Sequence, residues 1–122
     1  MTAPPVVTLA EKLATFADHW NPRIVGNYNG NELRLAKLKG EFSWHAHAAT
    51  DELFLVLEGE LEIDFEDGMR RLRKGEAIVI PAGTQHRPRA AEECHVLLMD
   101  REGEPNTGVN PSEFTRDKLE TA

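Results

Sequence analysis

The chain has 122 residues, of which 40% are hydrophobic and 29% are charged, a balance typical of one soluble globular domain. Asp and Glu outnumber Lys and Arg by 21 to 14, and the formal charge of −7 argues against nucleic acid or an anionic membrane as a partner. The single cysteine, Cys94, excludes an internal disulfide. Because residues 1–12 lack the pattern of a signal peptide and no apolar run is long enough to span a membrane, we expect a cytoplasmic protein.

The first 22 residues are expected to form an arm and a helix that packs on the rest of the domain. Residues 1–7 are small or proline-rich, and Thr8 with Glu11 has the spacing of a capping box. Pro22 would end the helix. One apolar face is expected from residues at helical spacing: Leu9, Leu13, Phe16 and Trp20.

Residues 23–101 show the signals of β-strands. Strands are expected at 23–27, 32–38, 41–47, 52–57, 60–65, 70–72, 76–80, 85–89 and 94–100. Glycine-bearing turns separate many of them and no helical pattern intervenes, which predicts an all-β antiparallel sandwich or barrel. Residues 102–122 are richer in Gly, Pro, Asn and charge, and are expected to form a surface tail that is frayed at its end.

His45, His47, Glu52 and His86 are the candidate metal ligands. His45 and His47 are two residues apart, so on an extended strand both side chains emerge on the same face. Glu52 begins an apolar strand, and His86 follows a Pro-Ala-Gly turn. Three imidazoles and one carboxylate form a plausible first shell for a divalent transition metal. Asp51 is a rival to Glu52, which is favoured because it begins the strand and reaches further.

The spacing of these residues resembles the two conserved motifs of the cupin superfamily. The first motif corresponds to His45-x-His47, four residues, Glu52, six residues and Gly59. The second corresponds to Gly75, five residues, Pro81-x-Gly83, two residues and His86. Two positions depart from the pattern: four residues rather than five separate Gly40 from His45, and Ala90 stands where the second motif usually has Asn.

The resemblance covers about residues 33–99 and has definite implications for fold and cofactor. It implies a double-stranded β-helix, or jelly roll, with His45, His47, Glu52 and His86 converging inside it. It also implies one divalent transition metal per chain, which could be Fe, Mn, Ni, Zn or Cu. The chain is most similar to small bacterial single-domain cupins of an uncharacterised subfamily, from which no activity can be transferred.

Three functions are compatible with this pattern. The first is a metal-dependent enzyme acting on a small oxygen-rich organic molecule, with dioxygenase, isomerase or lyase chemistry left open. The second is a non-catalytic module that binds or senses a small ligand. The third is a metal-independent isomerase of the sugar-nucleotide type, which would need a His–Asp general base. No further acid or base stands beside the ligands in the sequence, so no reaction is assigned.

Strand parity predicts an outward apolar stripe and, from it, a homodimer. If His45 and His47 point inward, then Phe42, Trp44 and Ala46 point outward. A small barrel would need to cover such a stripe with its helix and a second subunit.

Parity also bears on the last strands. Cys94 and His95 lie on opposite faces of one strand, so at most one of them points into the barrel. Arg87 and Arg89 alternate with His86 and are expected to face outward as paired surface charge.

Overall fold

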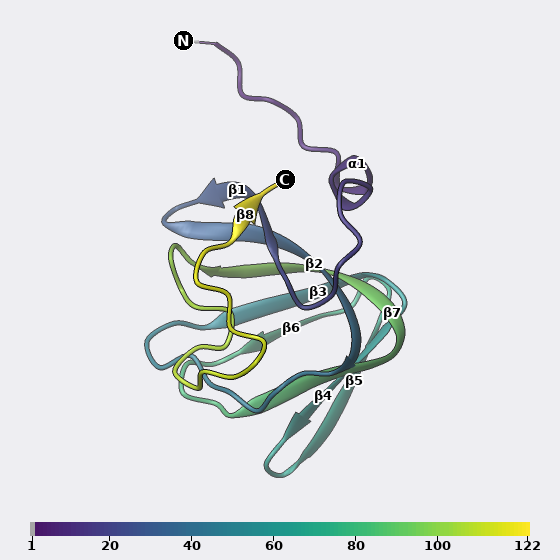
Figure 1. Cartoon of the computed structure of the whole chain (residues 1–122), viewed down its shortest axis with the longest axis vertical. Helices are drawn as coiled ribbons and strands as arrows, with labels where there is room; N and C mark the ends of the chain where they lie inside the picture. Colours follow the sequence, from purple (N-terminus) through teal and green to yellow (C-terminus); the bar gives the residue numbers. More distant parts are fainter. Residues whose placement is uncertain (1) are drawn as a thin grey trace.

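The computed structural model describes residues 2–122, which form an antiparallel β-structure with one short helix (Figure 1). In chain order the elements are α1 (Leu9–Leu13), β1 (Arg23–Tyr28), β2 (Asn31–Glu41), β3 (Glu52–Glu58), β4 (Glu60–Phe65), β5 (Gly68–Arg73), β6 (Ala77–Ile80), β7 (His86–Arg101) and β8 (Glu120–Thr121). The strands predicted at 85–89 and 94–100 are one continuous strand, β7.

The long strand β7 connects the two layers of the molecule. Its first residues pair with β4, its later residues pair with β3, and β2 pairs with it along most of its length. The outer strands follow from these pairs: β5 lies on β4, β6 on β3, and β1 with β8 on β2. Figure 1 shows β2 and β7 curving from one layer into the other. The sheet does not close into a full ring of hydrogen bonds, and the arrangement is the predicted all-β jelly roll.

The main core lies between the two layers, on the inward face of alternating strand residues. In β4, Leu61 and Ile63 are fully buried, and in β7 the residues Cys94, Val96 and Leu98 point inward in the same way. Each such aliphatic side chain contributes about 1.5–3 kcal/mol when it is fully removed from water. The prediction for the Cys94 and His95 pair is confirmed: Cys94 is the inward residue, and burial raises the pKa of its thiol to about 12.

The helix is shorter than the sequence predicts. It begins after Thr8 as expected but ends at Leu13, and the Thr8 hydroxyl makes no capping hydrogen bond. The chain leaves the helix because Trp20 is held against β2: its backbone N–H donates to the Lys37 carbonyl and its indole N–H to the Lys39 carbonyl. Phe16 and Trp20 consequently pack in two different clusters rather than on one helical face. No helix in residues 2–122 is long and apolar enough to cross a membrane.

The predicted strand at 41–47 is largely absent, and the outward stripe is absent with it. β2 ends at Glu41, after a bulge between Leu38 and Gly40, so the strand parity does not continue into the histidine segment. Phe42 is only 7% exposed and stacks on Trp20 with ring centroids 4.7 Å apart, and Ala46 is also buried. The expectation is therefore wrong for Phe42 and Ala46, and Trp44 alone is exposed, at 42%.

The C-terminal segment is part of the fold rather than a frayed tail. Residues 120–121 form β8, which pairs in parallel with β1. Asn106 and Thr107 are buried, and the backbone N–H of Val109 donates to the carbonyl of Ala46. Figure 1 shows this segment, in yellow-green, running back across the open end of the jelly roll. The segment therefore lies directly against the chain that carries the histidines.

Candidate metal centre

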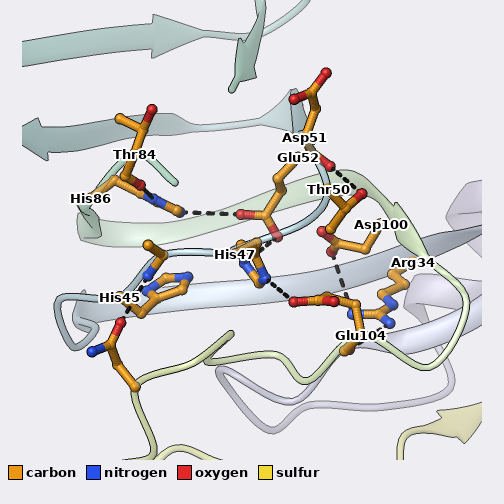
Figure 2. Close-up of polar contacts among 12 residues, drawn as sticks. Arg34, His45, His47, Thr50, Asp51, Glu52, Thr84, His86, Asp100 and Glu104 are labelled. Atoms are coloured by element: carbon orange, nitrogen blue, oxygen red, sulfur yellow. Dashed lines mark hydrogen bonds and ion pairs between the residues drawn. The ribbon is translucent and has the colours of Figure 1, made fainter. Parts of the chain in front are cut away.

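The structure brings the four predicted ligands together inside the jelly roll (Figure 2). Each offers one ligand atom, and these atoms all lie within 4.8 Å of one another. All four side chains are buried. The fold thus brings His45 and His86 close together although they are far apart in the sequence.

Backbone pairing fixes where the ligands stand. His45 and His86 form an isolated antiparallel bridge, with N–H to carbonyl distances of 3.0 and 2.9 Å in the two directions. Glu52 is the first residue of β3, and His86 is the first residue of β7. The carbonyl of His47 accepts the N–H of Gly83 at 2.7 Å, which ties the histidine segment to the Pro-Ala-Gly turn.

The histidine rings are oriented by hydrogen bonds at Nδ1. His45 Nδ1 donates to the Ser43 carbonyl at 3.0 Å, and His86 Nδ1 donates to the Thr84 carbonyl at 2.9 Å. His47 Nδ1 donates to a carboxylate oxygen of Glu104 at 2.9 Å. Carbonyl and carboxylate oxygens only accept hydrogen bonds, so each ring has a proton at Nδ1 and directs its Nε2 into the cluster.

Glu52 lies between two of the rings and has the charge that a metal site needs. Its Oε1 is 3.2 Å from Nε2 of His86, and its Oε2 is 3.4 Å from Nε2 of His47. The Nε2 of His47 is buried and has no hydrogen-bond partner. A buried polar nitrogen is costly without a partner, and three imidazole nitrogens with one carboxylate are donors that suit Fe, Mn, Ni, Zn or Cu. The residues present therefore fit a divalent transition metal.

Asp51 points away from the cluster. Its side chain is exposed, and its Oδ1 accepts the backbone N–H of Ala82 at 2.9 Å. Figure 2 shows Glu52 directed at the histidines and Asp51 directed to the other side of the strand. Asp51 thus supports the turn before His86, and Glu52 is the carboxylate of the cluster.

Burial and mutual proximity separate the pKa values of these groups. Burial, aided by the neighbouring His86, lowers the pKa of His45 to about 4. Burial also opposes the charged form of His47, but the Glu52 carboxylate outweighs it and raises the pKa of His47 to about 9. For Glu52 the penalty of burial is outweighed by His47 and His86, so the pKa of this carboxyl lies below its usual value.

The sequence reasoning missed a second polar layer behind the ligands. Asp100 and Glu104 are acidic groups beside the site, although neither stands next to the ligands in the sequence. Arg34 donates to Glu32 at 2.7 Å, to Asp100 at 3.3 Å and to the Glu104 carbonyl at 2.9 Å. Burial, followed by the nearby Glu52 carboxylate, raises the pKa of Asp100 well above its usual value.

One of these residues had a signal in the sequence. Asp100 has the same parity as Val96 and Leu98 along an alternating strand, which places it on the core face. Glu104 had no such signal, because it follows the last long strand in an irregular segment.

A cavity of about 30 Å³ adjoins the site, with room for roughly two or three water molecules. His45, Glu52, Arg34, Asp100 and Asn106 form its polar side. Its other walls are mostly apolar and are formed by Trp20, Pro22, Ala36, Leu38, Phe42, Phe54, Pro88 and Leu98. This lining, mostly apolar with a few convergent polar groups, is of the kind found in small-molecule sites, but the volume is well below the roughly 300 Å³ at which such sites begin.

A jelly roll with three inward histidines and a glutamate is the arrangement of the cupin class of protein. The family model for the Cupin domain matches residues 32–100, and the chain belongs to this family. The matched range contains all four residues of the cluster.

Individual relatives agree with this assignment. The uncharacterised protein YdbB of Bacillus subtilis (strain 168) is 46% identical over 67 residues, which are 54% of this chain and 59% of that protein, so the chain spans less than two thirds of this relative. The crystal structure of a cupin-2 domain protein from Shewanella frigidimarina is 42% identical, with a TM-score of 0.79 over 80% of this chain and 95% of that one. A crystal structure from Neisseria meningitidis is 33% identical, with a TM-score of 0.74 over 80% of this chain and 100% of that one.

Proposed function

We propose that this cupin is a metal-dependent enzyme that acts on a small oxygen-rich organic molecule at the cluster of His45, His47, Glu52 and His86. The observation that carries the proposal is the buried Nε2 of His47, which has no hydrogen-bond partner and faces the Glu52 carboxylate 3.4 Å away. His45, His47, Glu52 and His86 would hold one divalent transition metal ion per chain, either Fe, Mn, Ni, Zn or Cu.

The four ligands leave room for a substrate oxygen. Three imidazoles and one carboxylate would satisfy four positions, so a metal that accepts five or six ligands would keep open positions, which are what catalytic sites retain. When bound, the metal would supply Lewis-acid polarisation of a substrate oxygen. With three neutral imidazoles and one carboxylate the site keeps a net positive charge, which favours hydroxyl, enolate or carboxylate oxygens despite the chain's overall charge of −7.

The surrounding residues support catalysis as well as binding. Phe54 and Leu98 exclude water from one side of the cavity. Asp100 lines the same cavity, and its raised pKa lets it hold a proton at a carboxyl oxygen beside Glu52. A buried carboxyl of this kind is a candidate for proton transfer to or from a bound molecule.

The metal site is tested by one matched pair of variants. Glu52→Gln and Asp51→Asn each remove one negative charge from adjacent residues without changing side-chain size. Elemental analysis of protein purified without chelator should find close to one transition metal ion per chain in the wild type and in Asp51→Asn. Glu52→Gln and His86→Ala should lose most of it. Equal metal content in the wild type and His86→Ala would refute the assignment.

The ligand is tested by thermal shift with a panel of 2-oxo acids, diketones, enediols and carboxylates. Stabilisation should require the metal-loaded protein, because the oxygen donors would bind through the ion. Equal stabilisation of metal-free protein would place the ligand elsewhere. Mass spectrometry of a compound that binds the metal-loaded protein then distinguishes the two functions. An enzyme would convert the compound, whereas the alternative, a non-catalytic binding module, would leave it unchanged.

A further inference from the structure

The three histidine rings of the cluster are not held in the same way. His45 and His86 are each anchored at Nδ1 by the backbone carbonyl two residues earlier. That arrangement is local and uses no other side chain. His47 has no such local anchor, and its Nδ1 is held by the carboxylate of Glu104, 57 residues away in the sequence.

Glu104 is itself held in place by a buried side chain. The Arg34 guanidinium is 1% exposed, and its Nη2 donates to the Glu104 carbonyl at 2.9 Å. The Glu104 N–H donates to the Arg101 carbonyl, which forms a turn directly after β7. The backbone of Glu104 is therefore fixed at a point from which its carboxylate contacts His47 (Figure 2).

The segment that follows Glu104 is fixed against the histidines in turn. Asn110 accepts the N–H of Ala46 at its Oδ1, and the Val109 N–H donates to the Ala46 carbonyl at 3.0 Å. Gly108 packs so closely that a Cβ there would lie 1.9 Å from the Ala46 oxygen and 3.2 Å from His47 Nδ1. The same segment that packs on Ala46 and His47 therefore also carries the Glu104 carboxylate to His47.

We infer that Glu104 is the positioning residue for His47, and that the segment after the barrel completes the centre from outside the matched cupin range of 32–100. The carboxylate keeps the proton of His47 at Nδ1 and turns Nε2 toward Glu52 and His86. What this does for a metal rests on the function proposed above. In a metal site, a carboxylate that accepts from a histidine ligand orients the imidazole ring and strengthens its nitrogen as a metal donor. The loss of such a partner typically weakens metal binding about 10–100-fold.

The test compares Glu104→Leu with Glu104→Gln and with Glu102→Leu. Gln keeps an oxygen that can accept from Nδ1–H, whereas Leu does not. Glu102 is an exposed acid in the same segment, so Glu102→Leu controls for the loss of one charge there. Protein labelled with ¹⁵N-histidine reports the Nδ1–H resonance of His47 in the metal-free chain, identified as the signal missing in His47→Gln. Competition with a chelator reports the affinity for Zn²⁺.

The wild type, Glu104→Gln and Glu102→Leu should show a slowly exchanging Nδ1–H on His47 and similar affinity for Zn²⁺. Glu104→Leu should lose that resonance and bind Zn²⁺ about 10–100-fold more weakly. If Glu104→Leu does not fold, as judged by circular dichroism, Glu104→Ala takes its place.

The inference is overturned if Glu104→Leu keeps the His47 resonance, or if Glu104→Gln loses affinity as fully as Glu104→Leu. A wild-type chain that binds neither Zn²⁺ nor any of the other divalent metals named above would instead refute the proposed function. In that case the resonance of the metal-free chain still decides the role of Glu104.

Discussion

The Arg34 guanidinium donates to the carboxylates of Glu32 and Asp100 and to the carbonyl of Glu104, and its side chain is 1% exposed. A charge at this depth is tolerated only because both carboxylates and the carbonyl satisfy its N–H groups. The same guanidinium links β2, the end of β7 and the C-terminal segment. Arg34 is therefore expected to stabilise the whole fold as well as the candidate site.

Replacing Arg34 with Met should destabilise the protein by about 3–5 kcal/mol, because it leaves the buried Glu32 carboxylate without its cation and the buried Asp100 carboxyl without its donor. Arg71 gives a matched control, since it also contacts two carboxylates, of Glu60 and Glu62, but is 44% exposed. Arg71→Met should cost no more than about 1 kcal/mol. Urea unfolding of both variants measures the difference. Equal costs would show that Arg34 is not a structural cation.

At the scale of residues, the sequence could predict only those contacts that follow from the spacing of a motif. His45, His47, Glu52 and His86 come together as the motif spacing implied, because backbone pairing and a tight turn place them. The contact between His47 and Glu104 could not be predicted, since it joins residues 57 positions apart through an irregular segment. A spacing rule has no information about such a contact.

At the scale of elements, alternation and glycine turns predicted the strands well, because both are local properties. Two predictions failed where tertiary contacts override the local pattern. The helical spacing of Phe16 and Trp20 is not realised, because the Trp20 backbone and indole bind β2. The strand parity assumed for Phe42 is not realised, because a bulge and Gly40 at φ 84° end the regular part of β2.

The C-terminal segment gives a prediction at the same scale. Gly108 and Gly103 both have positive φ, 57° and 79°, so an alanine at either position should cost about 1 kcal/mol from backbone strain. Only at Gly108 would the new Cβ also meet the Ala46 backbone, whereas at Gly103 nothing lies within 4 Å. Gly108→Ala should therefore be clearly more destabilising than Gly103→Ala.

Hydrogen exchange at Val109 provides the local measurement. Its N–H is protected by the Ala46 carbonyl in the docked segment, and Gly108→Ala should remove that protection while Gly103→Ala keeps it. Unchanged protection at Val109 in Gly108→Ala would contradict the close packing of this segment.

At the scale of the whole molecule, the homodimer stays a prediction, but fewer exposed apolar residues now support it. Phe42 no longer contributes to an outward stripe, since it packs on Trp20 and Phe114 within the protein. Trp44 is the exposed aromatic residue that remains of the stripe, and the Arg87 guanidinium lies over its ring at 5.6 Å. The Trp44 and Arg87 pair is thus what the predicted stripe still offers to a second subunit.

The core and the metal cluster are adjacent but separable, which predicts how the protein responds to metal removal. The main apolar cluster gathers residues from β2, β3, β4 and β7 and is continuous without an ion. The metal-free chain should consequently stay folded and unfold cooperatively, unlike small domains that depend on zinc.

Adding Zn²⁺ at about 100 times its Kd should raise the free energy of unfolding by about 2.7 kcal/mol. For a chain of this size that corresponds to a rise in Tm of about 10 °C. Calorimetry with and without chelator measures the shift, which Glu52→Gln should abolish and Asp51→Asn should preserve. Loss of folded structure on chelation would show instead that the ion is an integral part of the core.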